Sequence, residues 1–310
     1  MPYTGSYTLT ARCLTEFMGT FCAISFGDGV VANALLSSTG GNGMGAGWIA
    51  FGFGMAFTFP IMMFGYGSSY FNPAMALAGL MRNEISVRDY FALAASQMVA
   101  GFCAGIFVYL LYLPHFQKIP EVSMSLEDAL PSLAPANKVT LQNLLGNSSK
   151  VGDASAKSSE LAEAHTIIAA DQGKKLGVLC TRPAIFMPIH NFFVELMGTA
   201  TIVVGANLIG SRMSMITSSA DMQALGIALQ PFLVGMLIMT LILAMGGPTG
   251  FAANPARDMG PRLAHMLLPI PGKGTSEFSY GIMINIGMLL GGVLGGALIM
   301  AMDQVRFWTL

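Results

Sequence analysis

The stretch Gly246–Arg262, GGPTGFAANPARDMGPR, interrupts a strongly apolar part of the chain. It is too short to cross a bilayer, yet long apolar runs flank it on both sides. Asn254-Pro255 at its centre is a turn signal, and proline is favoured in the first turn of a helix, where its missing N–H costs nothing. The stretch therefore predicts an extended arm that ends at Asn254 and a short helix that runs from Pro255 through Arg257 toward Leu263.

The plan of this stretch occurs twice in the chain. Asn72-Pro73-Ala74 repeats Asn254-Pro255-Ala256, and again lies between apolar runs. Glu16 in the segment EFMGT is echoed by Glu195 in the segment ELMGT, at nearly the same offset as the two asparagines. Two features in the same order and at the same offset indicate an internal repeat.

The composition places the chain in a membrane. Of its 310 residues, 54% are hydrophobic and 10% are charged, and the mean hydropathy is +0.62. Soluble domains carry about 25% charged residues. The net charge of −1 offers no basic surface for nucleic acid. No arrangement of Ser, His, Cys or Asp suggests catalysis, so we expect neither an enzyme nor a bound metal or cofactor.

A membrane-spanning helix needs about 20 mostly apolar residues. Six stretches qualify: 13–36, 46–64, 90–114, 186–209, 223–245 and 279–302. Two shorter apolar pieces, 72–81 and 255–265, follow the Asn-Pro-Ala motifs and are too short to span.

These stretches predict an all-α membrane protein that forms a single channel domain over residues 1–310. Repeat 1 covers about 9–114, a long extracellular loop about 115–185, and repeat 2 about 186–302. Each repeat has three spans and one short re-entrant helix. Because three is odd, the second repeat is inverted in the membrane relative to the first, as in known transport proteins.

Positive charge in short flanking segments predicts the orientation. One side of the membrane collects Arg12, Arg82, Arg88, Arg212 and Arg306, and the other collects Arg262 and Lys273. We therefore expect a multi-pass protein of the plasma membrane with both termini in the cytoplasm.

The two motifs predict a site for neutral solutes. Where the repeats meet, two helix N-termini bring partial positive charge, and the amides of Asn72 and Asn254 present N–H donors. Such a site accepts oxygen-bearing neutral solutes and repels cations, as expected of a pore for water or small polyols.

Four charged side chains within the apolar runs need an account, since charge at membrane depth is costly and commonly functional. Arg257 would face the lumen, with an interfacial position as the alternative. Glu16 and Glu195 would accept N–H bonds from the two arms, with proton coupling as the alternative. Asp28 would line a vestibule or pair nearby. Gln97 would brace the first arm.

These motifs, together with ASQMVAG around Gln97, resemble the aquaporin (major intrinsic protein) family, and GFAANPARDMGPR resembles its glycerol-facilitator (aquaglyceroporin) branch. The resemblance implies one pore per subunit and a homotetramer. It implies that Asn72 and Asn254 orient the permeant, and that Arg257 belongs to the narrow selectivity filter.

The resemblance also assigns the remaining filter positions. They fall on Phe51 in the second span, on Ile242 in the fifth and on Phe251 three residues before the second Asn. Asp258, with Arg262 after it, would anchor loop backbone. Tyr70 departs from the family, which commonly has His there. Ile242 lacks the His of strict water channels, and Ile284 with Asn285 fits neither branch.

These observations predict a passive channel for glycerol, other small neutral solutes and water that excludes protons and ions. Three alternatives stay open at this point. They are a water-selective aquaporin, an ion-coupled secondary transporter of inverted-repeat type, and a non-conducting scaffold that uses the segment 115–185.

Overall fold

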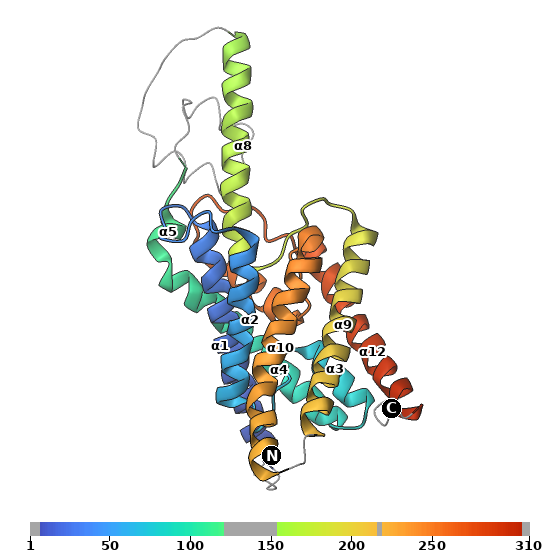
Figure 1. Cartoon of the computed structure of the whole chain (residues 1–310). Coiled ribbons are helices and arrows are strands. Elements are labelled where there is room, and N and C mark those ends of the chain that lie inside the picture. Colours follow the sequence, from blue (N-terminus) through green and yellow to red (C-terminus); the bar gives the residue numbers. More distant parts are fainter. Residues whose placement is uncertain (1–6, 121–153, 216–218, 306–310) are drawn as a thin grey trace.

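The computed structural model describes residues 7–120, 154–215 and 219–305, and every regular element in these ranges is a helix (Figure 1). Six helices are long and apolar enough to cross a membrane: α1 (Leu9–Leu35), α2 (Gly45–Phe64), α4 (Val87–Leu111), α9 (Pro188–Ser214), α10 (Ala220–Thr249) and α12 (Phe278–Gln304). The six predicted spans are confirmed, with small shifts at their ends.

Two short helices follow the Asn-Pro-Ala motifs, α3 (Pro73–Met81) and α11 (Pro255–Leu267). Each begins with proline at its first position, and each is capped by the preceding asparagine. The side-chain oxygen of Asn72 accepts from the N–H of Ala74 at 2.9 Å, and that of Asn254 accepts from the N–H of Ala256 at 3.0 Å. An asparagine cap satisfies an otherwise unpaired N–H, which explains why both helices begin at these motifs.

The two repeats pack as an inverted pair. In the first repeat α1 contacts α2 and α4, and in the second α9 contacts α10 and α12 in the same way. The repeats meet through α2 and α10. Each short helix packs against the last span of the other repeat, α3 on α12 and α11 on α4. This exchange brings the first turns of α3 and α11 to the middle of the bundle.

Glycine allows the short helices to approach so closely. A methyl group at Gly101 of α4 would overlap the carbonyl oxygen of Ala256, and one at Gly292 of α12 would overlap that of Ala74. Small residues let helix backbones approach closely within a membrane. The two contacts occupy equivalent places in the two repeats.

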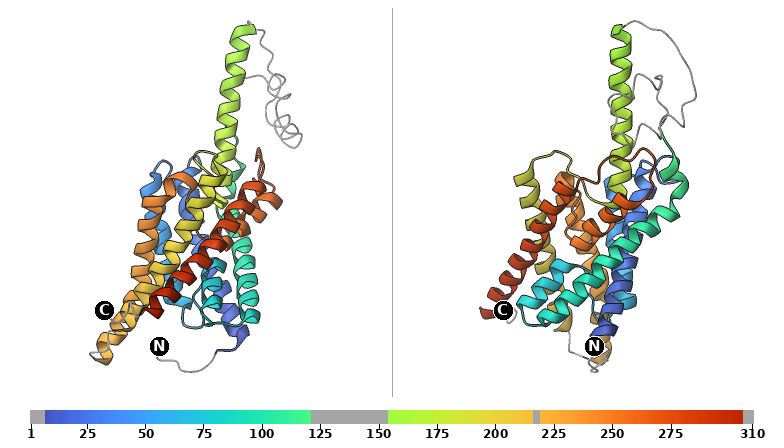
Figure 2. Two further views of the ribbon diagram at one scale, coloured as in Figure 1. Left: turned by 90° about the vertical axis from the view of Figure 1, so that its right-hand side faces the viewer. Right: turned by 180° about the vertical axis from the view of Figure 1, so that it is seen from behind.

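The segment 115–185, predicted as a long loop, contains further helical structure. The short helix α5 (Leu113–Gln117) opens it, and α8 (Ala154–Leu179) projects from one end of the bundle (Figures 1 and 2). At the opposite end α1 begins and α12 ends. The prediction of a loop was therefore wrong for 154–179, because α8 lacks the long apolar run by which the spans were found. Residues 121–153 lie outside the described residues.

The C-terminal part of α8 packs against the bundle. The ammonium group of the buried Lys175 donates to the carbonyl oxygens of Lys118 at 2.9 Å and Pro271 at 3.0 Å, and it pairs with Asp171 at 2.7 Å. These bonds join α8 to the segment after α5 and to the loop between α11 and α12. The chain after α8 is thereby held at one end of the bundle.

Candidate functional site

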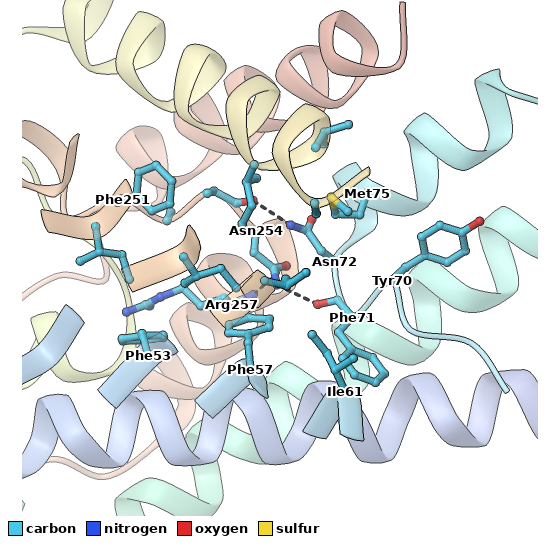
Figure 3. A pocket seen from close by; sticks show the side chains of 18 of the residues that line it. Phe53, Phe57, Ile61, Tyr70, Phe71, Asn72, Met75, Phe251, Asn254 and Arg257 are labelled. Atoms are coloured by element: carbon cyan, nitrogen blue, oxygen red, sulfur yellow. Dashed lines mark hydrogen bonds between the residues drawn. The ribbon is translucent and has the colours of Figure 1, made fainter. Parts of the chain in front are cut away.

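The two asparagines lie side by side where α3 and α11 begin, each bonded to the arm of the other repeat (Figure 3). The Nδ2 of Asn72 donates to the carbonyl oxygen of Ala253 at 2.8 Å, and the Nδ2 of Asn254 donates to that of Phe71 at 2.8 Å. An amide nitrogen carries two protons, so each asparagine keeps a second N–H. The site thus presents two N–H donors fixed by the same geometry.

The backbone just before each asparagine adopts a rare conformation. Phe71 has φ 46° and Ala253 has φ 47°, and each directly precedes one of the asparagines. Positive φ is uncommon for residues other than glycine and is associated with functional sites. Phe71 and Ala253 are also the residues whose carbonyl oxygens accept the hydrogen bonds from the side chains of Asn254 and Asn72.

Glu16 supports the first arm from α1. Its Oε1 accepts from the hydroxyl of Ser68 at 2.5 Å and from the N–H of Tyr70 at 2.8 Å. Its Oε2 accepts from the N–H of Phe71 and from the Nε2 of Gln97, both at 2.7 Å. Four donors therefore surround one buried carboxylate.

Glu195 has the equivalent place in the second repeat. Its Oε1 accepts from the N–H of Ala252 at 3.0 Å, and its Oε2 accepts from the N–H of Ala253 at 2.9 Å. Both glutamates thus hold the two residues that precede an asparagine. Non-helical backbone at membrane depth must be satisfied by protein or water, and these carboxylates provide acceptors for it.

A cavity of about 770 Å³ runs along both asparagines. One part of its lining comes from the region of Tyr70, Arg82 and Glu84, and another from Gly177 and Arg182 at the base of α8. Arg82 lies at the end of the short helix α3, whereas Arg182 follows the projecting helix α8. The cavity therefore extends through the bundle from the one region to the other, as a pore would.

Arg257 follows the second motif and lines the cavity. Its side chain is buried, its guanidinium carbon lies 5.0 Å from the centre of the Phe53 ring, and its Nη1 has no hydrogen-bond partner. Arg257 thus lines the cavity beside the aromatic ring of Phe53, with Nη1 itself buried (Figure 3). The buried position replaces the alternative of an arginine at the membrane interface.

The prediction that Phe51 faces this site was wrong. Phe51 does not line the cavity; its side chain is 47% exposed on the outside of α2 and packs near Trp48. Phe53 lines the cavity instead. Two residues along a helix differ by about 200° around its axis, so a register error of two positions reverses the direction of a side chain.

The other residues assigned to the filter do line the cavity. Ile242 of α10 and Phe251 of the second arm both contribute to its wall, as does Tyr70 of the first arm. The hydroxyl of Tyr70 donates to Glu84 at 3.2 Å. Phe251 has φ 52°, so the second arm has positive φ on both sides of Ala252.

Asp258 does not line the cavity and binds the surrounding loops. Its Oδ1 accepts from the N–H and the hydroxyl of Thr181 at 3.0 and 2.9 Å, and from the Nη2 of Arg262 at 2.8 Å. Its Oδ2 accepts from the Nε of Arg262 at 3.1 Å and the Nδ2 of Asn285 at 2.9 Å.

Arg262 completes this network. It donates from Nη2 to the carbonyl oxygen of Thr181 at 2.8 Å and from Nη1 to that of Ser276 at 2.9 Å. The pair Asp258–Arg262 is fully buried and joins α11 to the segments on either side of it. The sequence did not identify Thr181, because it lies in a stretch read as a loop, and it gave Asn285 no role.

The described residues offer no group of three His, Cys, Asp or Glu side chains that could hold a metal ion. The chemistry of the site is that of hydrogen-bond donors at the end of two helices, in a cavity with apolar and aromatic walls.

Comparisons with known proteins agree with this arrangement. The family model "Major intrinsic protein" matches residues 4–149 and 160–299. A "Probable glycerol uptake facilitator protein" of Thermotoga maritima is 32% identical over 288 residues, which are 92% of this chain and 96% of the relative. "Glycerol uptake facilitator protein 3" of Lactiplantibacillus plantarum is 32% identical over 295 residues, which are 94% and 96% of the two chains.

A solved structure shares the fold. The X-ray structure of the aquaglyceroporin from Plasmodium falciparum superposes with a TM-score of 0.62 and covers 94% of this chain and 95% of its own, at 18% sequence identity. The inverted pair of repeats with two short central helices is therefore an aquaporin-type fold.

Proposed function

Because the chain belongs to the major intrinsic protein family, we propose that it is a passive channel for glycerol, other small neutral solutes and water. The observation that carries the proposal is the cavity that passes both Asn72 and Asn254 and then Arg257. The two relatives named glycerol uptake facilitators support glycerol as a permeant.

The paired asparagines suit a neutral solute rather than an ion. Each keeps one N–H after donating the other to the opposite arm, and each caps a helix whose N-terminus carries partial positive charge. A hydroxyl or water oxygen can accept from these donors. A sodium ion or a hydronium ion would meet positive potential and lose its hydration, so we propose that protons and ions are excluded.

The surroundings of Arg257 suit a polyol in particular. Glycerol has hydroxyls along one side and carbon atoms along the other. The guanidinium of Arg257, which lines the cavity, would donate to the hydroxyls, while Phe53 and Phe251 provide aromatic surface for the carbons. We assign these three residues and Ile242 to the selectivity filter, with Phe53 in the place first given to Phe51.

The proposal is tested by stopped-flow light scattering on vesicles that contain the purified protein. Inward glycerol gradients should give rapid, non-saturating swelling that does not change when sodium or proton gradients are imposed or collapsed. Vesicles without protein provide the baseline. Flux that requires either gradient, or glycerol entry no faster than through the bare lipid, would refute the proposal.

A water-selective channel is the second candidate, and Ile242 is the observation that favours it. Its bulk lies in the cavity wall at a place where a smaller residue would leave a wider path. If Ile242 limits the width, Ile242→Gly should raise glycerol permeability without a comparable rise for water. Leu243→Ala is the matched control, because Leu243 is 56% exposed on the outside of the same helix. Fast water entry without glycerol entry in the unmodified protein would establish this candidate.

We further propose that the protein lies in the plasma membrane with both termini in the cytoplasm, and that it forms a homotetramer. Large apolar side chains on the outside of the bundle, such as Ile189 at 86% and Phe91 at 66% exposure, support contact with lipid or neighbouring subunits. Light scattering coupled to size exclusion should give a protein mass of four 32.7 kDa chains after correction for detergent.

A further inference from the structure

Asp28 is a buried acid that the account of the channel has not yet used. It lies on α1, its side chain is 0% exposed, and it does not line the cavity. Neither of its carboxylate oxygens has a hydrogen-bond partner. Its Oδ1 lies 3.5 Å from the Nη2 of Arg257. The sequence left two possibilities for Asp28, a place in the lining of a vestibule or a pair with a nearby group. In the structure Asp28 pairs with Arg257 and does not line the cavity.

A buried carboxylate without hydrogen bonds is costly unless a cation lies beside it. Among the described residues, Arg257 is the cation within ion-pair distance of Asp28. The guanidinium of arginine keeps its proton in proteins. An ionised Asp28 balances this charge, which is present in any case.

The other charges nearby are already balanced among themselves. Asp258 and Arg262 form a pair in which both side chains are fully buried. Asp28 is therefore the acid available to offset Arg257. With it in place, Arg257 lines the cavity with its guanidinium while the pair as a whole carries no net charge.

We propose that Asp28 is a specificity-determining residue of the channel: its carboxylate balances the charge of Arg257, so that the filter keeps hydrogen-bond donors for neutral solutes and does not attract anions. Asp28 also positions the guanidinium, because its Oδ1 lies 3.5 Å from Nη2 while the guanidinium carbon lies over the ring of Phe53. The inference rests on the proposed function in taking Arg257 as part of the permeation path.

The test replaces Asp28 by asparagine, which keeps the shape and removes the charge. Permeability to chloride and to formate is measured as conductance in planar bilayers, and glycerol flux is measured in vesicles from the same preparation. Asp28→Asn should raise the ratio of anion to glycerol permeability by about tenfold or more, since one unbalanced charge a few ångströms from the path has an interaction of at least that size in protein interiors. Asp89→Asn is the matched control, because Asp89 pairs with Arg12 away from the cavity.

A second variant separates charge balance from a merely structural role. Asp28→Asn combined with Arg257→Gln removes both charges, so the anion conductance should return to the level of the unmodified protein. If the single variant Asp28→Asn fails to fold, the double variant should give more folded protein, because it no longer buries the unpaired charge of Arg257. The proposal is overturned if Asp28→Asn folds without any gain in anion permeability, or if the double variant is no better than the single one in either respect.

The two proposals fail separately. Absence of glycerol flux in the unmodified protein counts against the proposed function. The anion conductance of each variant, relative to that of the unmodified protein, counts for or against Asp28 and does not require glycerol to pass.

Discussion

The guanidinium carbon of Arg257 lies 5.0 Å from the centre of the Phe53 ring. A cation at this distance from an aromatic face is attracted by about 0.5–2 kcal/mol, depending on how far both groups are removed from water. Arg257 belongs to the second repeat and Phe53 to the first, so the contact fixes one side of the cavity across the interface between the repeats.

Phe53→Ala should widen this part of the cavity and loosen Arg257. We expect the permeability ratio of erythritol to glycerol to rise by about tenfold, the size of effect that small changes in an apolar pocket commonly have on selectivity. Stopped-flow swelling with each polyol measures it. Phe51→Ala is the control, since Phe51 is outside the cavity on the same helix. The assignment fails if Phe51→Ala changes the ratio and Phe53→Ala does not.

Glu195→Gln should destabilise the second arm. An amide offers one acceptor oxygen where the carboxylate of Glu195 accepts from both Ala252 and Ala253, so one buried N–H loses its partner. The expected cost is about 1–3 kcal/mol, seen as a lower midpoint of thermal unfolding in detergent. Thr201→Val controls for loss of a polar group from the same helix, because the hydroxyl of Thr201 is exposed and bonds within α9. Equal midpoints for the two variants would contradict a supporting role for Glu195.

Gly101→Ala and Gly292→Ala should each displace a short helix. In either variant the new methyl group overlaps the carbonyl oxygen that follows an Asn-Pro pair, and overpacking of this kind costs about 1–3 kcal/mol. Both variants should lose glycerol flux and unfold at lower temperature. At Gly29 a methyl group meets no atom within 4 Å, so Gly29→Ala should change neither quantity. Normal flux through both Gly101→Ala and Gly292→Ala would show that the asparagines tolerate displacement.

Asp258→Asn and Glu277→Gln compare a buried ion pair with an exposed one. Asp258→Asn leaves Arg262 buried without its partner, at an expected cost of about 3–5 kcal/mol. Glu277 pairs with Arg182 where both side chains are partly exposed, and such pairs contribute about 0–1 kcal/mol. Asp258→Asn should therefore give little folded protein by size exclusion, and Glu277→Gln should give a normal yield. A normal yield of Asp258→Asn would mean that another group satisfies Arg262.

Some residues assigned to the filter could be predicted from the sequence and others could not. Phe251 and Arg257 line the cavity as expected, because both lie a fixed number of residues from Asn254 and the chain between them is short. Phe53 was missed because the nearest motif is distant from it, and an error of two positions is enough to change which side of α2 is assigned to the cavity. Asp28 was left with two possible positions, since its partner Arg257 is remote in the sequence.

The sequence by itself determined the spans, the inverted repeat and the two short helices. Bilayer thickness fixes the length of an apolar helix, and Asn-Pro both caps and begins a helix locally. Only the tertiary structure decided that the chain after α8 holds Thr181 against Asp258, that Phe53 rather than Phe51 faces Arg257, and that Asp28 lies beside Arg257. Each of these depends on the rotation of one helix about its axis relative to another, which is set by packing between residues far apart in the chain and not by any local pattern.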